Sequence, residues 1–213
     1  MNTMTYMRTK LLFCVFAVMT TGLFISCSNE DTPNVTQSAD FKIEFNEYGD
    51  LILKNYRPIS QSDFNKYVLG YGWKEYDTRQ VMSDGSVAPN DYWYGRVDGG
   101  PESYEFSEGK VIDYIRLDVI PSGASYREQT MHYDESTGKV YFDDRNIFVI
   151  LSVSDDEITA IKKGEIINED GDQEQIFLYV KMRKLSDNQL QDIKKVYWVD
   201  YNALFRAMIP QDI

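Results

Sequence analysis

The chain has 213 residues, a formal net charge of −12 at pH 7, a single histidine and two cysteines. An acidic surface of this kind repels nucleic acid and anionic lipid headgroups, so we expect no nucleic-acid partner. One histidine and two cysteines are too few for a His-cluster or Cys-based metal site, and the sequence predicts neither a metal nor a cofactor.

The N-terminus has the pattern of a secretory signal peptide. Arg8 and Lys10 form a short basic region, and an uncharged, mostly apolar run follows from Leu11 to Ile25. At ~1.5 Å per residue, this run is too short to span a hydrocarbon core of about 30 Å comfortably. We therefore predict a signal peptide over residues 1–26. Its removal leaves a mature part with a charge of −14, because the signal region holds two basic residues and no acidic ones.

The signal region ends in Leu23-Phe24-Ile25-Ser26-Cys27, which resembles the lipobox of bacterial lipoproteins. In that motif the small residue lets the peptidase approach, and the cysteine thiol takes a diacylglycerol. We expect lipidated Cys27, with acyl chains such as palmitate, to anchor the mature protein to a membrane, since each buried methylene contributes about 0.8 kcal/mol. The alternatives are an ordinary signal peptide followed by an incidental cysteine, or an uncleaved anchor.

The segment after Cys27 is polar, and we interpret residues 27–40 as a flexible tether. Ser28-Asn29-Glu30-Asp31 resembles the acidic stretch by which Bacteroides-type lipoproteins are routed to the outer face of the outer membrane. A solvated tether with no routing role also fits, because Val35 is the only large apolar residue of the segment. The predicted location is the outer membrane, with the lipid-anchored protein facing either the periplasm or the cell surface.

Short alternating apolar and polar runs, bounded by turn residues, dominate residues 41–184. Phe41 to Phe45 and Leu51 to Leu53 predict a hairpin, and a short helix follows, capped by Ser60 or Ser62 and stopped by Gly70. About eight or nine consecutive strands are then predicted. They cover residues 73–82, 92–94, 104–106, 111–119, 126–134, 140–142, 146–153, 158–167 and 176–182.

Consecutive antiparallel strands joined by short turns close most simply into an up-and-down barrel, which removes exposed sheet edges. The sequence thus predicts a mainly β fold, with residues 41–213 forming a single barrel domain. After Ser186 the pattern changes to helical spacing, with Leu190, Ile193 and Tyr197 among the apolar positions. We expect one C-terminal amphipathic helix packed on the barrel, or two helices broken near Trp198-Val199.

Several segments together resemble the lipocalin-like domains of small Bacteroidota outer-membrane lipoproteins, over about residues 60–185. They are Gly72-Trp73 after a short helix, residues 104–109, residues 147–159 and Tyr179-Val180-Lys181-Met182-Arg183. The resemblance implies a lipocalin-like barrel in which Trp73 packs across the closed end against Arg183, a contact worth about 0.5–2 kcal/mol. The glycine spacing departs from the family, in which one residue separates the glycine from the tryptophan.

Residues Tyr92, Trp93 and Tyr94 are the candidate binding site. They lie beside Gly95, Gly99, Gly100 and Pro101, in a segment that is too loop-like to bury every ring. Tyrosine and tryptophan offer stacking faces and polar groups to carbohydrate or protein partners, although the same rings could serve only as packing. The acidic turn at residues 168–172 does not fit the calcium-binding EF-hand pattern.

The chain contains no nucleophile motif, phosphate-binding loop or other catalytic constellation, and we interpret it as a non-enzymatic protein. The leading hypothesis is a cell-envelope lipoprotein that binds a small apolar ligand inside the barrel, or a glycan or protein at its mouth. The alternative is a structural or accessory subunit of an envelope complex. In that case the barrel is filled, and the C-terminal helix or the hairpin at residues 41–56 docks the partner.

Overall fold

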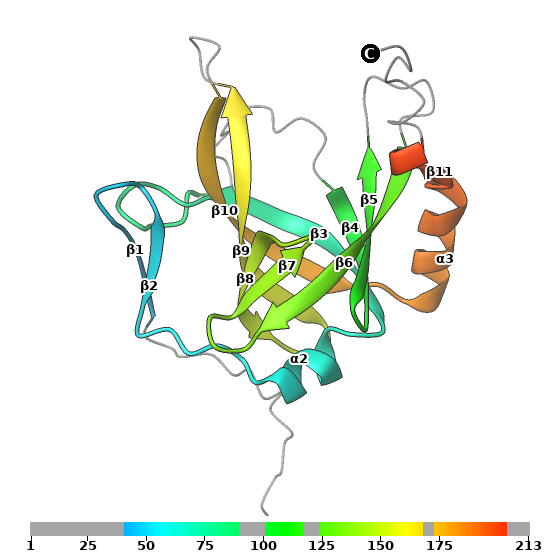
Figure 1. Cartoon of the computed structure of the whole chain (residues 1–213), viewed down its shortest axis with the longest axis horizontal. Helices are drawn as coiled ribbons and strands as arrows, with labels where there is room; N and C mark the ends of the chain where they lie inside the picture. The colour runs from blue at the N-terminus through cyan, green and yellow to red at the C-terminus, as the bar shows by residue number, and fades with distance from the viewer. Residues whose placement is uncertain (1–40, 90–100, 117–123, 168–172, 204–213) are drawn as a thin grey trace, which may run out of the picture. The chain divides into compact units, whose positions relative to one another are not determined.

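The computed structural model describes residues 41–89, 101–116, 124–167 and 173–203, which all belong to one compact unit spanning residues 33–213 (Figure 1). Its elements in chain order are β1 (Lys42–Phe45), β2 (Leu51–Lys54), α2 (Gln61–Tyr67), β3 (Tyr71–Gln80), β4 (Pro101–Ser107), β5 (Lys110–Arg116), β6 (Ala124–Asp134), β7 (Lys139–Phe142), β8 (Arg145–Val153), β9 (Glu157–Ile167), β10 (Gln173–Lys184), α3 (Asp187–Val196) and β11 (Val199–Asp200).

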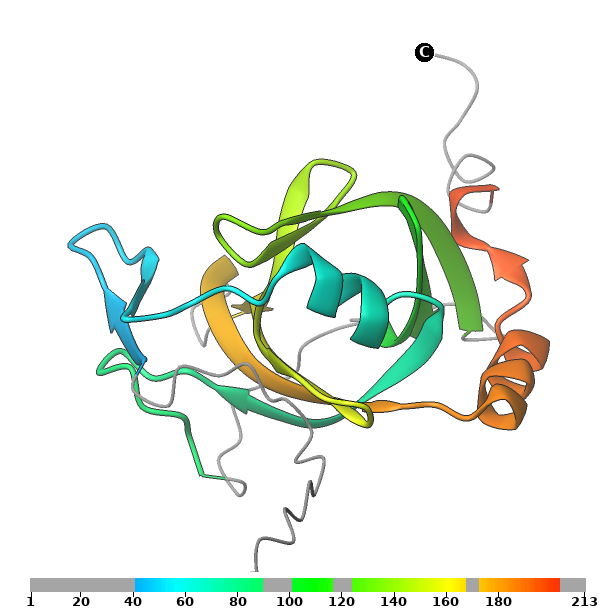
Figure 2. The same cartoon turned by 90° about the horizontal axis from the view of Figure 1, so that it is seen from below.

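Eight of the described strands, β3 to β10, form a closed antiparallel barrel (Figures 1 and 2). Each strand pairs with the next one along the chain, and β10 returns to pair with β3. The order is that of an up-and-down barrel, because no strand is inserted between sequence neighbours. This confirms the mainly β, antiparallel up-and-down barrel that the alternating runs predict.

Helix α2 covers one end of the barrel, as the view along the barrel shows (Figure 2). The helix begins after Ser60, whose hydroxyl accepts a hydrogen bond from the Asp63 backbone N–H at 3.0 Å. Its inner face buries Phe64 and Tyr67. Gly70 follows with a φ of +82°, a left-handed conformation that favours glycine where a helix ends. The predicted short helix with its cap and stop is therefore confirmed.

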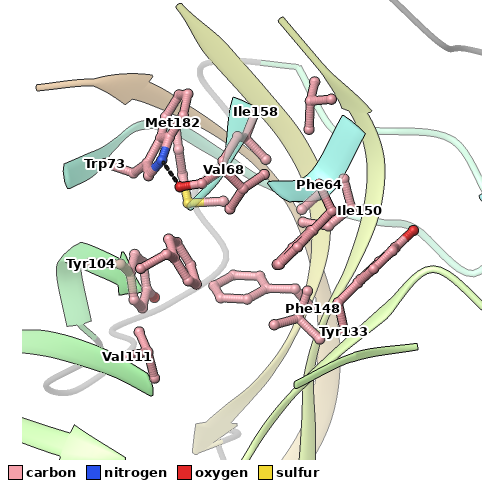
Figure 3. Packing of buried hydrophobic residues seen from close by; sticks show 14 of the residues in the cluster. Phe64, Val68, Trp73, Tyr104, Val111, Tyr133, Phe148, Ile150, Ile158 and Met182 are labelled. Atoms are coloured by element: carbon pink, nitrogen blue, oxygen red, sulfur yellow. Dashed lines mark hydrogen bonds between the residues drawn. The ribbon is translucent and has the colours of Figure 1, made fainter. Parts of the chain in front are cut away.

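The interior next to α2 is filled by aromatic and aliphatic side chains (Figure 3). Trp73 is fully buried, and its indole Nε1 donates a hydrogen bond to the Val68 carbonyl at 3.2 Å. The Phe64 ring stacks on Tyr133 with ring centroids 4.3 Å apart. Four further rings meet edge-on or tilted deeper in the barrel: Tyr104, Phe106, Phe142 and Phe148.

The β1–β2 hairpin packs on the outer face of the barrel and makes a second apolar cluster there. Ile43 belongs to this cluster with Leu151, Ile161 and Phe177 of β8, β9 and β10. Gly85 lies against the hairpin so closely that a Cβ would stand 1.9 Å from the Ile43 carbonyl oxygen, and its φ is +82°. Space and backbone conformation both require glycine at this position.

The C-terminal helix α3 begins at a capping box, in which Ser186 and Gln189 each accept the other's backbone N–H. The helix ends at Val196, and the chain continues as β11, which pairs in parallel with β6. The amphipathic helix is thus confirmed, and the predicted break near Trp198-Val199 is occupied by a strand. Valine and aromatic side chains at residues 196–199 favour extended backbone over helix, which explains why α3 stops here.

Candidate functional site

On four strands, a polar or charged side chain takes the inward-facing position next to the apolar cluster, whereas Ile115 and Leu178 keep parts of this face apolar farther from α2. Glu75 follows Trp73 on β3, Asp113 follows Val111 on β5, and Lys162 follows Ala160 on β9. On β6, which runs toward α2, Arg127 and Gln129 precede Met131. Because alternate residues of a strand share a face, these polar groups point into the barrel beyond the aromatic cluster. Figure 3 shows the apolar layer that lies beneath them.

Glu75, Tyr104 and Lys162 form one connected group in the barrel interior. The Lys162 Nζ lies 2.6 Å from Glu75 Oε1 and 3.3 Å from the Tyr104 hydroxyl. The Tyr104 hydroxyl donates a hydrogen bond to the same Glu75 oxygen at 2.7 Å. Burial raises the pKa of Tyr104 well above its ordinary value, and the Glu75 carboxylate adds to this effect. The phenol is therefore a permanent donor, and the ion pair is neutral as a whole.

A second polar group centres on Asp113, whose side chain is fully buried. The Arg127 Nη2 lies 2.6 Å from Asp113 Oδ2, and the Gln129 amide donates to the same oxygen at 3.0 Å. Arg145 in turn donates to Gln129 Oε1 at 3.1 Å, which links the group to the β7–β8 turn. Burial raises the pKa of Asp113, and the hydrogen bond and charge of Arg127 offset this only in part.

Two atoms of this second group have no hydrogen-bond partner among the residues that the structure describes: Asp113 Oδ1, an acceptor, and Arg127 Nε, a donor. A buried polar atom without a partner costs about 1–3 kcal/mol, so such atoms normally bind water or a ligand. The Ser125 hydroxyl, two residues before Arg127 on the same inner face, is also buried without a partner within the described ranges. Together these atoms offer an incoming molecule one acceptor, one donor and one hydroxyl that can act as either.

The C-terminal segment brings one aromatic ring to this group. Tyr201 follows β11, and its ring centroid lies 5.7 Å from the Arg127 guanidinium carbon. A tyrosine in this position holds the arginine by a cation–π contact while the guanidinium bonds Asp113. We call Glu75, Tyr104, Asp113, Ser125, Arg127, Gln129, Lys162 and Tyr201 the interior polar site.

The expected pairing of Trp73 with Arg183 is wrong. Trp73 faces the interior, whereas Arg183 pairs in register with Lys74 and faces outward, where it is exposed. Its guanidinium lies 4.6 Å from the ring centroid of Tyr76, whose hydroxyl bonds Glu157. The alternation of the strands places the two predicted partners on opposite faces of the wall.

The other predicted site residues lie outside the described ranges. These are Cys27 and the aromatic triplet of Tyr92, Trp93 and Tyr94. Among the described residues, no three potential metal ligands gather, and neither helix is long and apolar enough to cross a membrane.

The interior polar site is not among the sites predicted from the sequence, although the sequence holds one signal for it. Asp113 and Lys162 interrupt the apolar face of strands whose other inward positions are apolar, and a charge there must be paired inside the fold. The pairings themselves join residues 14 to 87 positions apart in the sequence. Only the closed barrel brings them together.

No protein-family model and no curated protein matches the chain. Two solved structures of bovine odorant binding protein match it. The complex with a selenium-containing odorant has 12% sequence identity and a TM-score of 0.33, and the match covers 67% of this chain and 87% of that one. The complex with undecanal has 13% identity and a TM-score of 0.33, over 75% of this chain and 93% of that one. The fold of this chain rests on its own strand pairing, given above.

Proposed function

We propose that this chain is a non-enzymatic binding lipoprotein of the cell envelope, whose barrel takes a small ligand at the interior polar site. The observation that carries the proposal is the pair of unsatisfied atoms, Asp113 Oδ1 and Arg127 Nε, on a carboxylate and a guanidinium that already bond each other. A folded protein keeps such atoms in its interior at a cost in stability, which a bound polar molecule would offset.

The chemistry of the site favours a neutral ligand that carries hydroxyl or amide groups. Lys162 is already paired with Glu75, and Arg127 with Asp113, so these two pairs carry no net charge toward a ligand. A hydroxyl can donate to Asp113 Oδ1 and accept from Arg127 Nε. A glycan fragment has groups of this type, and we favour it over a wholly apolar ligand, because aromatic side chains fill the interior beside α2.

Native mass spectrometry of the protein purified from its own envelope tests this proposal. We expect the wild-type protein to retain a molecule of low mass, and Arg127→Ala to lose it. Lys195→Ala, which removes an exposed lysine paired only within α3, is the matched control and should retain the molecule. If the wild-type protein carries no small molecule, or if Arg127→Ala retains it equally, the proposal fails.

Undecanal provides a probe for the apolar alternative, since it is the ligand named for one matched structure. If the ligand binds through hydrogen bonds to the interior polar site, we expect that undecanal does not displace the retained molecule. Full displacement by undecanal, with no loss of affinity in Arg127→Ala, would show that the ligand binds elsewhere and through apolar contacts.

The second candidate is an accessory subunit of an envelope complex, and exposed apolar side chains at the end of α3 favour it. Trp198 is 72% exposed and Val196 is 58% exposed, and neighbouring exposed apolar side chains are typical of protein-interaction sites. Affinity purification distinguishes the two roles. A stoichiometric protein partner that is lost in Trp198→Ser, with no retained small molecule, would favour the accessory role.

The envelope location depends on Cys27, which the lipobox resemblance predicts to be acylated. We expect Cys27→Ser to move the protein from the membrane fraction to the soluble fraction, because the acyl chains supply the anchor. Protein that stays with the membrane at high salt after this substitution would contradict the proposed anchor.

A further inference from the structure

The barrel wall beside the interior polar site is incomplete on one side of β6. Strand β7 pairs with β6 only at Met131–Asp134 of that strand, the half nearer α2. The β7–β8 turn then contacts Thr130 through the Asp143 side chain and backbone. Further along this edge, the described residues supply no strand from the barrel itself. Arg127 and Gln129, two residues of the interior polar site, lie on this uncovered stretch.

The C-terminal segment covers part of this edge from outside the barrel. We define the C-terminal strap as residues 187–203, which comprise α3, β11 and the residues up to Ala203. Strand β11 pairs with β6 at Ser125 and Tyr126 through Val199 and Asp200. Directly after β11, the ring of Tyr201 reaches Arg127. The strap therefore completes the wall at the level of the interior polar site.

Contacts between described residues on the outside of the barrel hold the strap in place. Leu190 packs on Gly72 of β3, and Lys194 Nζ lies 2.8 Å from Glu105 Oε1 of β4. Tyr197 meets the ring of Tyr114 on β5 edge-on, with centroids 5.7 Å apart. None of the residues of α3 is buried, and β11 contributes only two residues to the sheet. A segment with few buried contacts and a short strand opens at a lower free energy than the barrel it lies on.

We infer that the C-terminal strap is a gate, which opens and closes the side of the barrel over Arg127 and admits the ligand to the interior polar site. The role of the site as a binding site rests on the proposed function, whereas the opening of the strap does not. When the strap is closed, Tyr201 lies against Arg127, and Ser125 is 1% exposed. When the strap releases its contacts with Gly72, Glu105 and Tyr114, the pairing of β11 with β6 breaks and the edge of β6 becomes accessible.

Thiol reactivity tests the gate without any ligand, because residues 28–213 contain no cysteine. In the mature chain with Cys27→Ser, we introduce Ser125→Cys and measure its reaction with a soluble disulfide reagent. Leu190→Ala should raise the rate about tenfold or more, since it removes the apolar contact of α3 with the barrel. Lys194→Ala should raise it about two- to fivefold, as expected for a partly exposed ion pair.

Two controls separate opening of the gate from general loosening. Lys195→Ala removes an exposed lysine that, among the described residues, pairs with Asp192 of the same helix, and it should leave the rate unchanged. A thiol introduced as Ala160→Cys, in the filled core, should stay unreactive in every background. Equal rates for Ser125→Cys with Leu190→Ala and with Lys195→Ala would overturn the inference. A parallel rise at Ala160→Cys would also overturn it, because the whole barrel would then be opening. Failure of the proposed function would appear separately, as a wild-type protein without a retained molecule.

Discussion

Leu190 of α3 lies directly over Gly72 of β3, so close that any side chain at position 72 would require the Leu190 side chain to shift. A Cβ there would stand 2.9 Å from Leu190 Cδ1 and 3.2 Å from Leu185 Cδ1. We expect Gly72→Val to lower the free energy of unfolding by about 1–3 kcal/mol, because the Leu190 and Leu185 side chains must give way to it. Urea unfolding of Gly72→Val, Leu190→Ala and the double variant measures the coupling. The cost of Gly72→Val should shrink once Leu190 is truncated. If Gly72→Val costs as much stability with Leu190→Ala as without it, the packing of Leu190 on Gly72 is contradicted.

The ion pair between Lys162 and Glu75 is the most enclosed one described, with side chains 10% and 12% exposed. Lys162→Met should destabilise the protein by about 3–5 kcal/mol, because it leaves the Glu75 carboxylate in the interior without its cation. Adding Glu75→Gln should recover part of this loss, since the uncompensated charge is then gone. The exposed pair of Lys195 and Asp192 provides the control, and Lys195→Met should change the free energy of unfolding by about 0.5 kcal/mol or less. Equal effects at the two lysines would contradict a buried pair.

Trp73 and Arg183 should differ sharply in their contribution to stability, because they face opposite sides of the barrel wall. Trp73→Phe should cost about 2–4 kcal/mol, since it leaves a void and deprives the Val68 carbonyl of its donor. Arg183→Ala removes only an outward contact with Tyr76 and should cost at most about 1 kcal/mol. Thermal unfolding monitored by circular dichroism measures both. The direct pairing that the resemblance implies would be favoured by equal stability losses in Trp73→Phe and Arg183→Ala, together with a loss in the double variant that is smaller than their sum.

Asp113 should make the protein less stable as the pH rises from mildly acidic values. Burial raises the pKa of this carboxyl in the folded state above its ordinary value of 3.8, so the folded chain holds a proton that the unfolded chain has released. Stability from this group is complete below pH 3.8, and it declines as the pH rises through the folded-state pKa. Asp113→Asn should flatten the dependence of unfolding free energy on pH in this window. An unchanged slope would show that Asp113 is ionised in the folded protein at its ordinary pKa.

The alternating runs were sufficient to predict the barrel, because each strand carries its own period-two pattern and its own turn residues. The hairpin, the Ser60-capped helix and the Ser186-capped helix are equally local, and all three are confirmed. The break after Val196 was visible as a β-branched and aromatic run. That β11 pairs with β6 was not visible, because two residues carry no pattern.

The interior polar site could not be predicted, for a physical reason. A shift of the assumed strand register by one residue moves every side chain to the other face. The local sequence around a charged residue therefore does not by itself distinguish an inward position from an outward one. The sequence pattern marks Asp113 and Lys162, but only the closed barrel shows that their partners come from β6 and β3. The wrong pairing of Trp73 with Arg183 has the same origin. The resemblance indicates the two positions, but it does not indicate toward which side of the barrel wall each side chain points.

A high-resolution crystal structure of the mature protein, purified from its own envelope, tests most directly whether the barrel binds a ligand at the interior polar site. We predict density for a bound molecule within hydrogen-bond distance of Asp113 Oδ1 and Arg127 Nε, with the side chains beside α2 filling the rest of the interior. The contrary result is a direct hydrogen bond from Arg127 Nε to Asp113 Oδ1, with no density between the Asp113–Arg127 pair and Tyr201. The site is then a structural ion pair, and the proposed binding function is wrong.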